Sequence, residues 1–257
     1  MWYLIPGWRA SRLPWAILFH AFSVKICILP TVGLRPNLSA TIVINSANLR
    51  PSSKLALMFF LRAPSDEQIR QFISSQREQR FSYPEVGASR HGDVERVEGY
   101  TIDHQRIKLG VGENTFERAA DALRKWKHFC LGWVRIVPPD TAVEARATVA
   151  VLAKLFPLWS LNACRIVYVI DEDGPAMNAD DAPVKRFGFA YGTLRDHAER
   201  GEERFTIEWQ GNDDSVWYDI LAFSQPNLLA KLGYPLTRRL QKRFARDSLA
   251  AMVKALS

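Results

Sequence analysis

The stretch PLTRRLQKRFARDSLAAMVKAL, residues 235–256, decides the fold. Its apolar side chains recur at helical spacing and form one stripe, made of Leu236, Leu240, Phe244, Leu249, Val253 and Leu256. Proline is favoured in the first helical turn, so the pattern predicts a long helix that begins at Pro235. A helix with one apolar stripe must bury it against another element. This C-terminal helix therefore needs a partner surface upstream in the chain.

That surface is predicted to be a β-sheet. Six stretches between residues 133 and 223 are apolar or alternate in polarity: 133–137, 147–155, 164–170, 184–192, 204–209 and 216–223. A seventh strand is expected at 100–109, and after it a helix capped by Asn114. A short helix capped by Ser65 precedes both, and residues 81–99 are typical of a long surface connection. A short helix is also expected from Ser224 to Gly233.

This order predicts an α+β domain in which a curved antiparallel sheet of about seven strands wraps around the long C-terminal helix. The arrangement resembles the helix-grip fold of START-type and birch-pollen-allergen-type carriers of lipids and other hydrophobic ligands. That resemblance implies a cavity between sheet and helix. A split α+β protein with a solid core is the structural alternative.

Composition excludes several classes of protein. The 257 residues are 47% hydrophobic and 24% charged, which excludes collagen-like, coiled-coil and wholly disordered chains. The three cysteines, none in a C-x-x-C pair, cannot form a disulfide framework or a four-thiolate zinc site. We therefore expect a reducing, cytoplasmic location, with no cofactor and no metal.

The first fifth of the chain differs from the rest. Residues 1–57 carry six of the 34 basic side chains and no acidic one, which leaves 28 basic against 27 acidic groups for residues 58–257. Such an extension is typical of a targeting segment, which would allow export or organelle import, or of a translation start that really lies at Met58. We expect residues 1–57 to be poorly ordered and residues 58–257 to form a single helix-grip-like domain.

A closer resemblance rests on the segments Gly188-Phe189-Ala190-Tyr191-Gly192-Thr193-Leu194, His197 and Gly201-Glu202-Glu203-Arg204-Phe205. Together they are similar to the signature of a family of domains of unknown function found in bacteria and plants. The resemblance covers about residues 59–256. It implies a fold and assigns no catalytic residue.

The polar part of this signature suggests chemistry. Tyr191, His197, Glu202 and Glu203 could form an acid–base or metal site of an enzyme if burial shifted their pKa values. His197 and Glu199 also form an H-x-E pair, but the downstream cysteines of a zinc deaminase are missing. No residue is assigned as catalytic, and His197, Glu202 and Glu203 are the candidates. A solvated hairpin, with its glutamates paired to neighbouring arginines, explains the same residues.

Aromatic side chains suggest a binding function instead. Our leading hypothesis is that a small apolar or amphipathic ligand binds between sheet and helix. Its candidate contacts are Trp126, Trp133, Trp159, Arg165, Tyr168, Tyr191, Trp209 and Trp217. Indoles that simply fill a core are the alternative.

A third hypothesis is an interaction module that uses the basic side chains of the C-terminal helix. Arg238, Arg239, Lys242, Arg243 and Arg246 could contact anionic lipid or nucleic acid. Because Asp247 interrupts the basic face, a solvated surface is favoured. We expect no nucleic-acid partner and no stable membrane insertion.

Overall fold

The alternating stretches form the strands of one antiparallel sheet. The computed structural model describes residues 42–43, 56–60, 62–90, 94, 97–155, 158–174, 184–195, 197–226 and 234–257. In these residues the sheet has nine strands: β1 Ile42–Val43, β2 Ala56–Phe60, β3 Thr101–Val111, β4 Val134–Val137, β5 Thr148–Leu155, β6 Leu158–Gly174, β7 Val184–Thr193, β8 Glu199–Gln210 and β9 Ser215–Pro226. Their order is β1-β2-β6-β7-β8-β9-β3, while β5 pairs with both β4 and β6. Strands β3 to β9 are the seven expected from the sequence.

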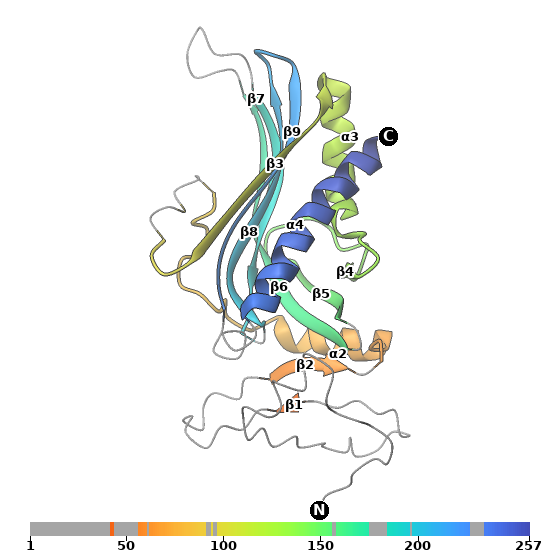
Figure 1. Ribbon diagram of the computed structural model, residues 1–257, viewed down its shortest axis with the longest axis vertical. Coiled ribbons are helices and arrows are strands. Elements are labelled where there is room, and N and C mark those ends of the chain that lie inside the picture. Colours follow the sequence, from red (N-terminus) through yellow and green to blue (C-terminus); the bar gives the residue numbers. More distant parts are fainter. Residues whose placement is uncertain are drawn as a thin grey trace, which may run out of the picture.

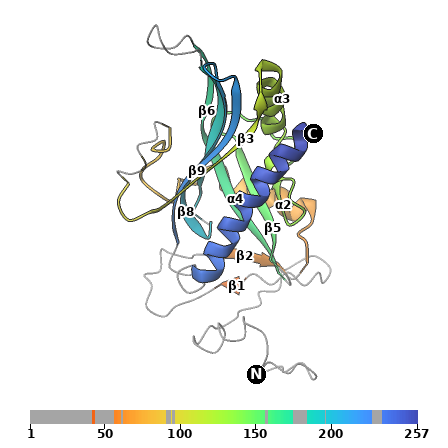
Figure 2. The ribbon, with the colours of Figure 1, turned by 45° about the horizontal axis from the view of Figure 1, so that its top comes forward.

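The long helix α4, Tyr234–Leu256, lies along the concave side of this sheet, beside α3, Glu113–Arg124 (Figures 1 and 2). Its Ala245 and Met252 belong to the main core cluster, together with Phe189 and Phe205 of the sheet. The Tyr218 hydroxyl also lies 3.0 Å from Ser248 Oγ of α4. The helix-grip prediction is confirmed.

A third helix covers the opposite, convex face of the sheet. Helix α2, Asp66–Gln76, begins with the capping box that the sequence predicts, in which Ser65 and Gln68 exchange hydrogen bonds. Its buried Phe72 and Ile73 pack in a cluster with Ala163 of β6. Residues of β6 that alternate with Ala163 face α4, so α2 and α4 lie on opposite faces of the sheet.

The connection between α2 and β3 is predicted to be a surface loop, but part of it is buried against the sheet. Tyr83 and Ser89 are buried, and Tyr83, Val97 and Phe223 share one hydrophobic cluster. The segment therefore covers the convex face of β8 and β9.

Two helix predictions need correction. Helix α3 begins at Glu113 after Gly112, not after a cap at Asn114, because Gly112 adopts a φ of 85° that favours glycine. The residues from Ser224 to Pro226 end strand β9 instead of starting a helix. The remainder of that expected helix, residues 227–233, lies outside the described residues, as does most of the extension at 1–57.

Two signature glycines permit close contacts between strands. A Cβ on Gly192 would collide with the Tyr83 ring, and a Cβ on Gly188 would collide with the backbone of Phe205. Close packing of β7 against the convex-face segment thus requires glycine at position 192, and close packing of β7 against β8 requires it at position 188.

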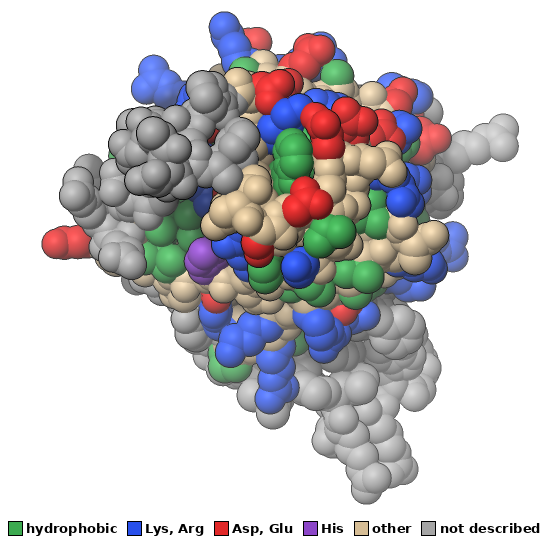
Figure 3. Space-filling model, turned by 90° about the horizontal axis from the view of Figure 1, so that it is seen from above, with side chains coloured by type: hydrophobic (Ala, Val, Ile, Leu, Met, Phe, Trp, Pro, Cys, Tyr) green, Lys and Arg blue, Asp and Glu red, His purple; other side chains and the backbone are tan. Residues whose placement is uncertain are grey.

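Charges of both signs share the surface. Seen from the end that carries α3 and the C-terminus, Asp and Glu side chains gather in one part of the surface, and Lys and Arg side chains lie around and beside them (Figure 3). Ion pairs such as Arg106–Glu208, at 3.1 Å, and Lys125–Asp121, at 2.7 Å, are typical of the described residues. Among those residues, no helix is long and apolar enough to cross a membrane.

Candidate functional site

Tyr191 and Glu203 form a pair on the concave face. They are directly opposite each other in the β7–β8 register, and the Tyr191 hydroxyl donates a hydrogen bond to Glu203 Oε2 at 2.7 Å. Tyr191 is only 7% exposed and contacts the rings of Phe129 and Phe205, with ring centroids 6.0 and 5.5 Å away. Glu203 is partly exposed. The pair therefore places a partly exposed carboxyl group beside aromatic rings on the concave face.

The surroundings change how this carboxyl group titrates. The pKa of Glu203 is raised to about 7. Burial is the largest cause, and the nearby Glu199 and Asp103 add to the rise, whereas the hydrogen bond from Tyr191 lowers the pKa. Burial also raises the pKa of Tyr191 well above its ordinary value, and the charge of Glu203 adds to that rise. Tyr191 thus stays a neutral donor, whereas Glu203 can exchange a proton near neutral pH.

Two further carboxylates lie on the same face and are tied to the first half of α4. Gln241 Nε2 donates to Glu199 Oε1 at 2.8 Å, and the Arg238 guanidinium forms a bidentate pair with Asp103. Burial raises the pKa of Glu199. We call Asp103, Glu199 and Glu203 the acidic strip. In the described residues, Arg238 is the one basic side chain that pairs with the acidic strip. The carboxyl groups therefore outnumber the basic groups there.

The four residues of the enzyme hypothesis do not all converge. Glu202 points to the convex face, because successive side chains of a strand alternate. It is 2% exposed and accepts hydrogen bonds from the Tyr83 hydroxyl at 2.7 Å and from the amides of Gly87 and Ser89 at 2.8 and 3.1 Å. Its contacts hold the segment after α2 against the sheet. Glu202 is therefore an anchoring group, and Tyr191 and Glu203 remain together.

His197 lies just before β8. Its Nδ1 accepts a hydrogen bond from the Glu199 amide at 2.9 Å, and burial lowers its pKa to about 4. Among the described residues, no three His, Cys, Asp or Glu side chains form a group suited to a metal ion.

The aromatic candidates divide between the two faces of the sheet. Trp126, Trp133, Tyr191 and Trp209 belong to or pack against the main core on the α4 side. Trp159 packs instead with α2, and Tyr168 bonds to Ser89 on the convex side at 2.6 Å. Trp217 alternates with the core residues Val216 and Tyr218 and stacks under Arg106, 4.5 Å from its ring. The eight candidates therefore do not line one shared space.

Arg165, the charged member of that set, has a structural contact. Its guanidinium donates to the carbonyl oxygens of Gln76 and Gln79, at 3.0 and 2.9 Å, at the end of α2. The basic face of α4 is also partly neutralised, because Arg243 and Arg246 both pair with Asp247.

Sequence reasoning missed the role of α4 in the polar site. Arg238 was expected on a solvated basic face and Gln241 had no predicted role, yet they contact Asp103 and Glu199. The available signal was Asp103 itself, a polar residue on the strand face that carries Ile107 further along.

Comparisons with known proteins find both similar structures and similar sequences. Several solved structures are similar at low sequence identity: a hypothetical protein of Helicobacter pylori, with TM-score 0.40 and 11% identity over 69% of this chain and 96% of that one, and human STARD10, with TM-score 0.31 and 15% identity over 75% and 81%.

Sequence relatives are closer. The chain is 39% identical over 213 residues to a UPF0548 protein of Dictyostelium discoideum, covering 77% of this chain and 96% of the relative. It is 35% identical to a UPF0548 protein of Arabidopsis thaliana over 74% of this chain and 94% of that one, and 34% identical to one of Deinococcus radiodurans over 77% and 98%. The sequence model of the domain of unknown function DUF1990 matches residues 82–251. The chain therefore belongs to the DUF1990 family, whose UPF0548 members occur in bacteria, plants and Dictyostelium.

Proposed function

We propose that the protein binds a small amphipathic molecule between the concave face of the sheet and the first half of α4. One observation carries the proposal: Glu203, a partly exposed carboxyl group, lies on the apolar concave face beside the rings that contact Tyr191. A carboxyl group that is partly withdrawn from water costs free energy, and a ligand that pairs with it offsets that cost. The apolar part of the ligand packs against the neighbouring aromatic rings, among them Phe129 and Phe244, whose centroids lie 4.9 Å apart.

The charge of the acidic strip defines the polar group of this ligand. The strip holds three carboxyl groups, and Arg238, the arginine that contacts it in the described residues, already pairs with Asp103. An amine satisfies the excess negative charge best, since an ammonium group donates three hydrogen bonds. A carboxylate or phosphate would be repelled.

A calorimetric titration tests this assignment. The full chain is titrated with decylamine below its micellar concentration, and with decanol to separate the head group from the alkyl chain. We expect decylamine to bind more tightly than decanol, and we expect the Glu203→Gln variant to lose roughly tenfold in affinity for the amine, which corresponds to the loss of one charge-assisted contact. Glu117→Gln is the matched control, because Glu117 is exposed on α3 and carries the same charge. Equal affinities for the Glu203→Gln and Glu117→Gln variants would contradict the proposal.

Acid–base catalysis by Glu203 is a second candidate, favoured by its pKa of about 7. Small molecules that copurify with the wild-type protein and with Glu203→Gln are compared by mass spectrometry. Catalysis predicts an altered molecule in the wild type and its precursor in the variant. The same molecule in both samples would leave binding as the function.

A further inference from the structure

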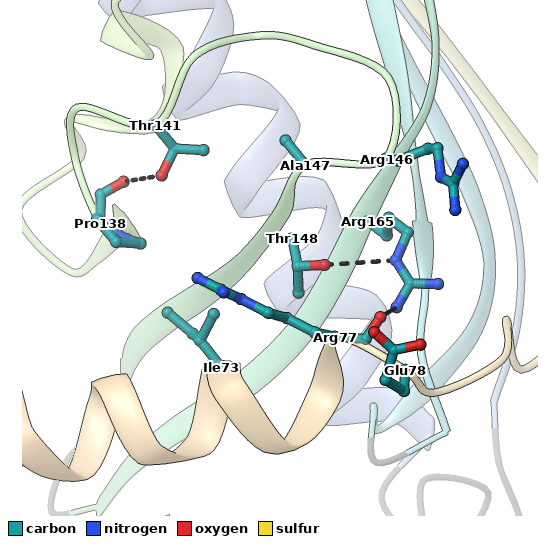
Figure 4. A pocket seen from close by; sticks show the side chains of 9 residues that line it. All are labelled: Ile73, Arg77, Glu78, Pro138, Thr141, Arg146, Ala147, Thr148 and Arg165. Carbon is teal, nitrogen blue, oxygen red and sulfur yellow. Dashed lines mark hydrogen bonds between the residues drawn. The ribbon is translucent and has the colours of Figure 1, made fainter.

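An open pocket of about 540 Å³ lies beside the C-terminal end of α2 (Figure 4). Thr148 of β5 and Arg165 of β6, which both line it, are directly opposite in the register and so share a face. The neighbours of Arg165 along the strand, Cys164 and Ile166, belong to the core on the α4 side. The pocket is therefore on the opposite face of the sheet from the acidic strip.

Three arginines line this pocket: Arg77, Arg146 and Arg165. Arg165 is fixed by neutral acceptors, namely the carbonyl oxygens at the end of α2 and Thr148 Oγ1 at 3.3 Å. In the described part of the chain, none of the three arginines has a carboxylate within ion-pair distance, and the guanidinium groups of Arg77 and Arg146, which are exposed, make no hydrogen bond. The pocket thus holds more positive charge than the described residues around it offset.

The balance of charge around Arg165 agrees with this description. Burial lowers the pKa of Arg165, Arg146 lowers it further, and Glu78 is the nearby acidic group that raises it. With Glu78 as the one acidic side chain among the lining residues, the pocket has a net positive charge. Arg146 is also held in a left-handed backbone conformation, φ 74°, where its amide donates to the Ile166 carbonyl at 2.8 Å.

We propose that this arginine pocket binds a small organic oxyanion, a phosphate or a carboxylate, through the guanidinium group of Arg77, which extends past Ile73, while Arg146 points to the opposite side and adds positive charge (Figure 4). Guanidinium groups match the geometry of both anions with paired hydrogen bonds. The volume is within the range of pockets that hold small organic molecules. Ile73, Pro138 and Ala147 supply an apolar wall for the rest of the ligand. The site is separate from the proposed amine site and does not depend on it.

Titration of the full chain with phenyl phosphate, benzoate and inorganic phosphate, in a buffer free of other oxyanions, tests the pocket. We expect phenyl phosphate or benzoate to bind, and the two probes distinguish a phosphate ligand from a carboxylate ligand. We expect weaker binding of inorganic phosphate, because it lacks the apolar part. The double variant Arg77→Gln/Arg146→Gln is expected to lose about tenfold or more in affinity.

The matched control is Arg135→Gln/Arg239→Gln, which removes the same charge at two exposed arginines elsewhere. Glu203→Gln serves as a second control, and it should bind the oxyanion as the wild type does. Unchanged thermal unfolding of the pocket variant shows that it remains folded. Failure of both organic probes to bind, or equal affinity in the pocket variant and its matched control, would overturn the proposal.

Discussion

Tyr191 of β7 and Glu203 of β8 are directly opposite each other, and the Tyr191 hydroxyl donates to Glu203 Oε2 at 2.7 Å. The hydrogen bond stabilises the ionised carboxylate and holds its pKa below the value that burial alone would give. Tyr191→Phe is therefore expected to move the Glu203 titration upward from about pH 7.

A carbon-13 NMR titration of labelled glutamate measures this shift. Tyr100→Phe is the control, because the Tyr100 hydroxyl donates to Glu85 on the convex side, at 2.7 Å, and its loss should leave Glu203 unchanged. A Glu203 midpoint that stays the same or falls in Tyr191→Phe would show that the pair does not control the carboxyl group.

His128 predicts a loss of stability in acid. It is fully buried among aromatic rings, its two ring nitrogens have no partner in the described residues, and burial lowers its pKa from 6.5 to about 3. Between those values the unfolded chain binds a proton at this position and the folded chain does not, so the free energy of unfolding falls as the pH falls. Glu203 acts in the opposite direction, because its raised pKa means that the folded state holds the extra proton.

Urea unfolding of the wild type and of His128→Leu isolates the histidine contribution. Lowering the pH from about 7 to about 5 should cost the wild type about 2 kcal/mol more than the variant. Identical losses of stability in the two proteins would mean that His128 is protonated in the folded state.

The hydrogen bonds of Glu202 predict that this one carboxylate anchors the convex-face segment, residues 81–99. Glu202→Ala leaves the Tyr83 hydroxyl and the Ser89 amide without their acceptor, so we expect the variant to lose about 3 kcal/mol of stability and to be cleaved faster between residues 81 and 99. Limited proteolysis and urea unfolding measure both effects. Glu202→Gln, which keeps an acceptor oxygen, should lose less. A Glu202→Ala variant as stable as Glu117→Gln would contradict this role.

Local signals predicted most of the fold. The Ser65–Gln68 capping box marks the start of α2, and the apolar spacing of the last segment identified α4 as the helix that the sheet grips. The expected stripe was partly wrong, because Leu236 and Val253 are exposed and Met252 is buried instead. Both depend on residues close in the sequence, which is why they could be read directly.

The candidate functional site is built from contacts between residues that are far apart in the sequence, and the spacing of residues along the chain cannot reveal such contacts. Glu202 binds Tyr83 from 119 residues away, and Gln241 reaches Glu199 across 42. Trp209 and Trp217 follow similar alternating patterns, yet the register pairs Trp209 with Val216 and Glu208 with Trp217, so the two indoles face opposite sides. A shift of one residue at the hairpin turn would have placed them together, and the turn residues Gly211 to Asp214 do not by themselves define which residues pair.

Amide hydrogen exchange of the full chain, with and without decylamine, most directly tests where the ligand binds. A molecule held between sheet and helix must slow exchange in β8 near Glu203 and in the first half of α4, and leave α2, at Asp66–Gln76, unchanged. Protection confined to α2, or absent from both β8 and α4, would contradict a binding site between the sheet and α4.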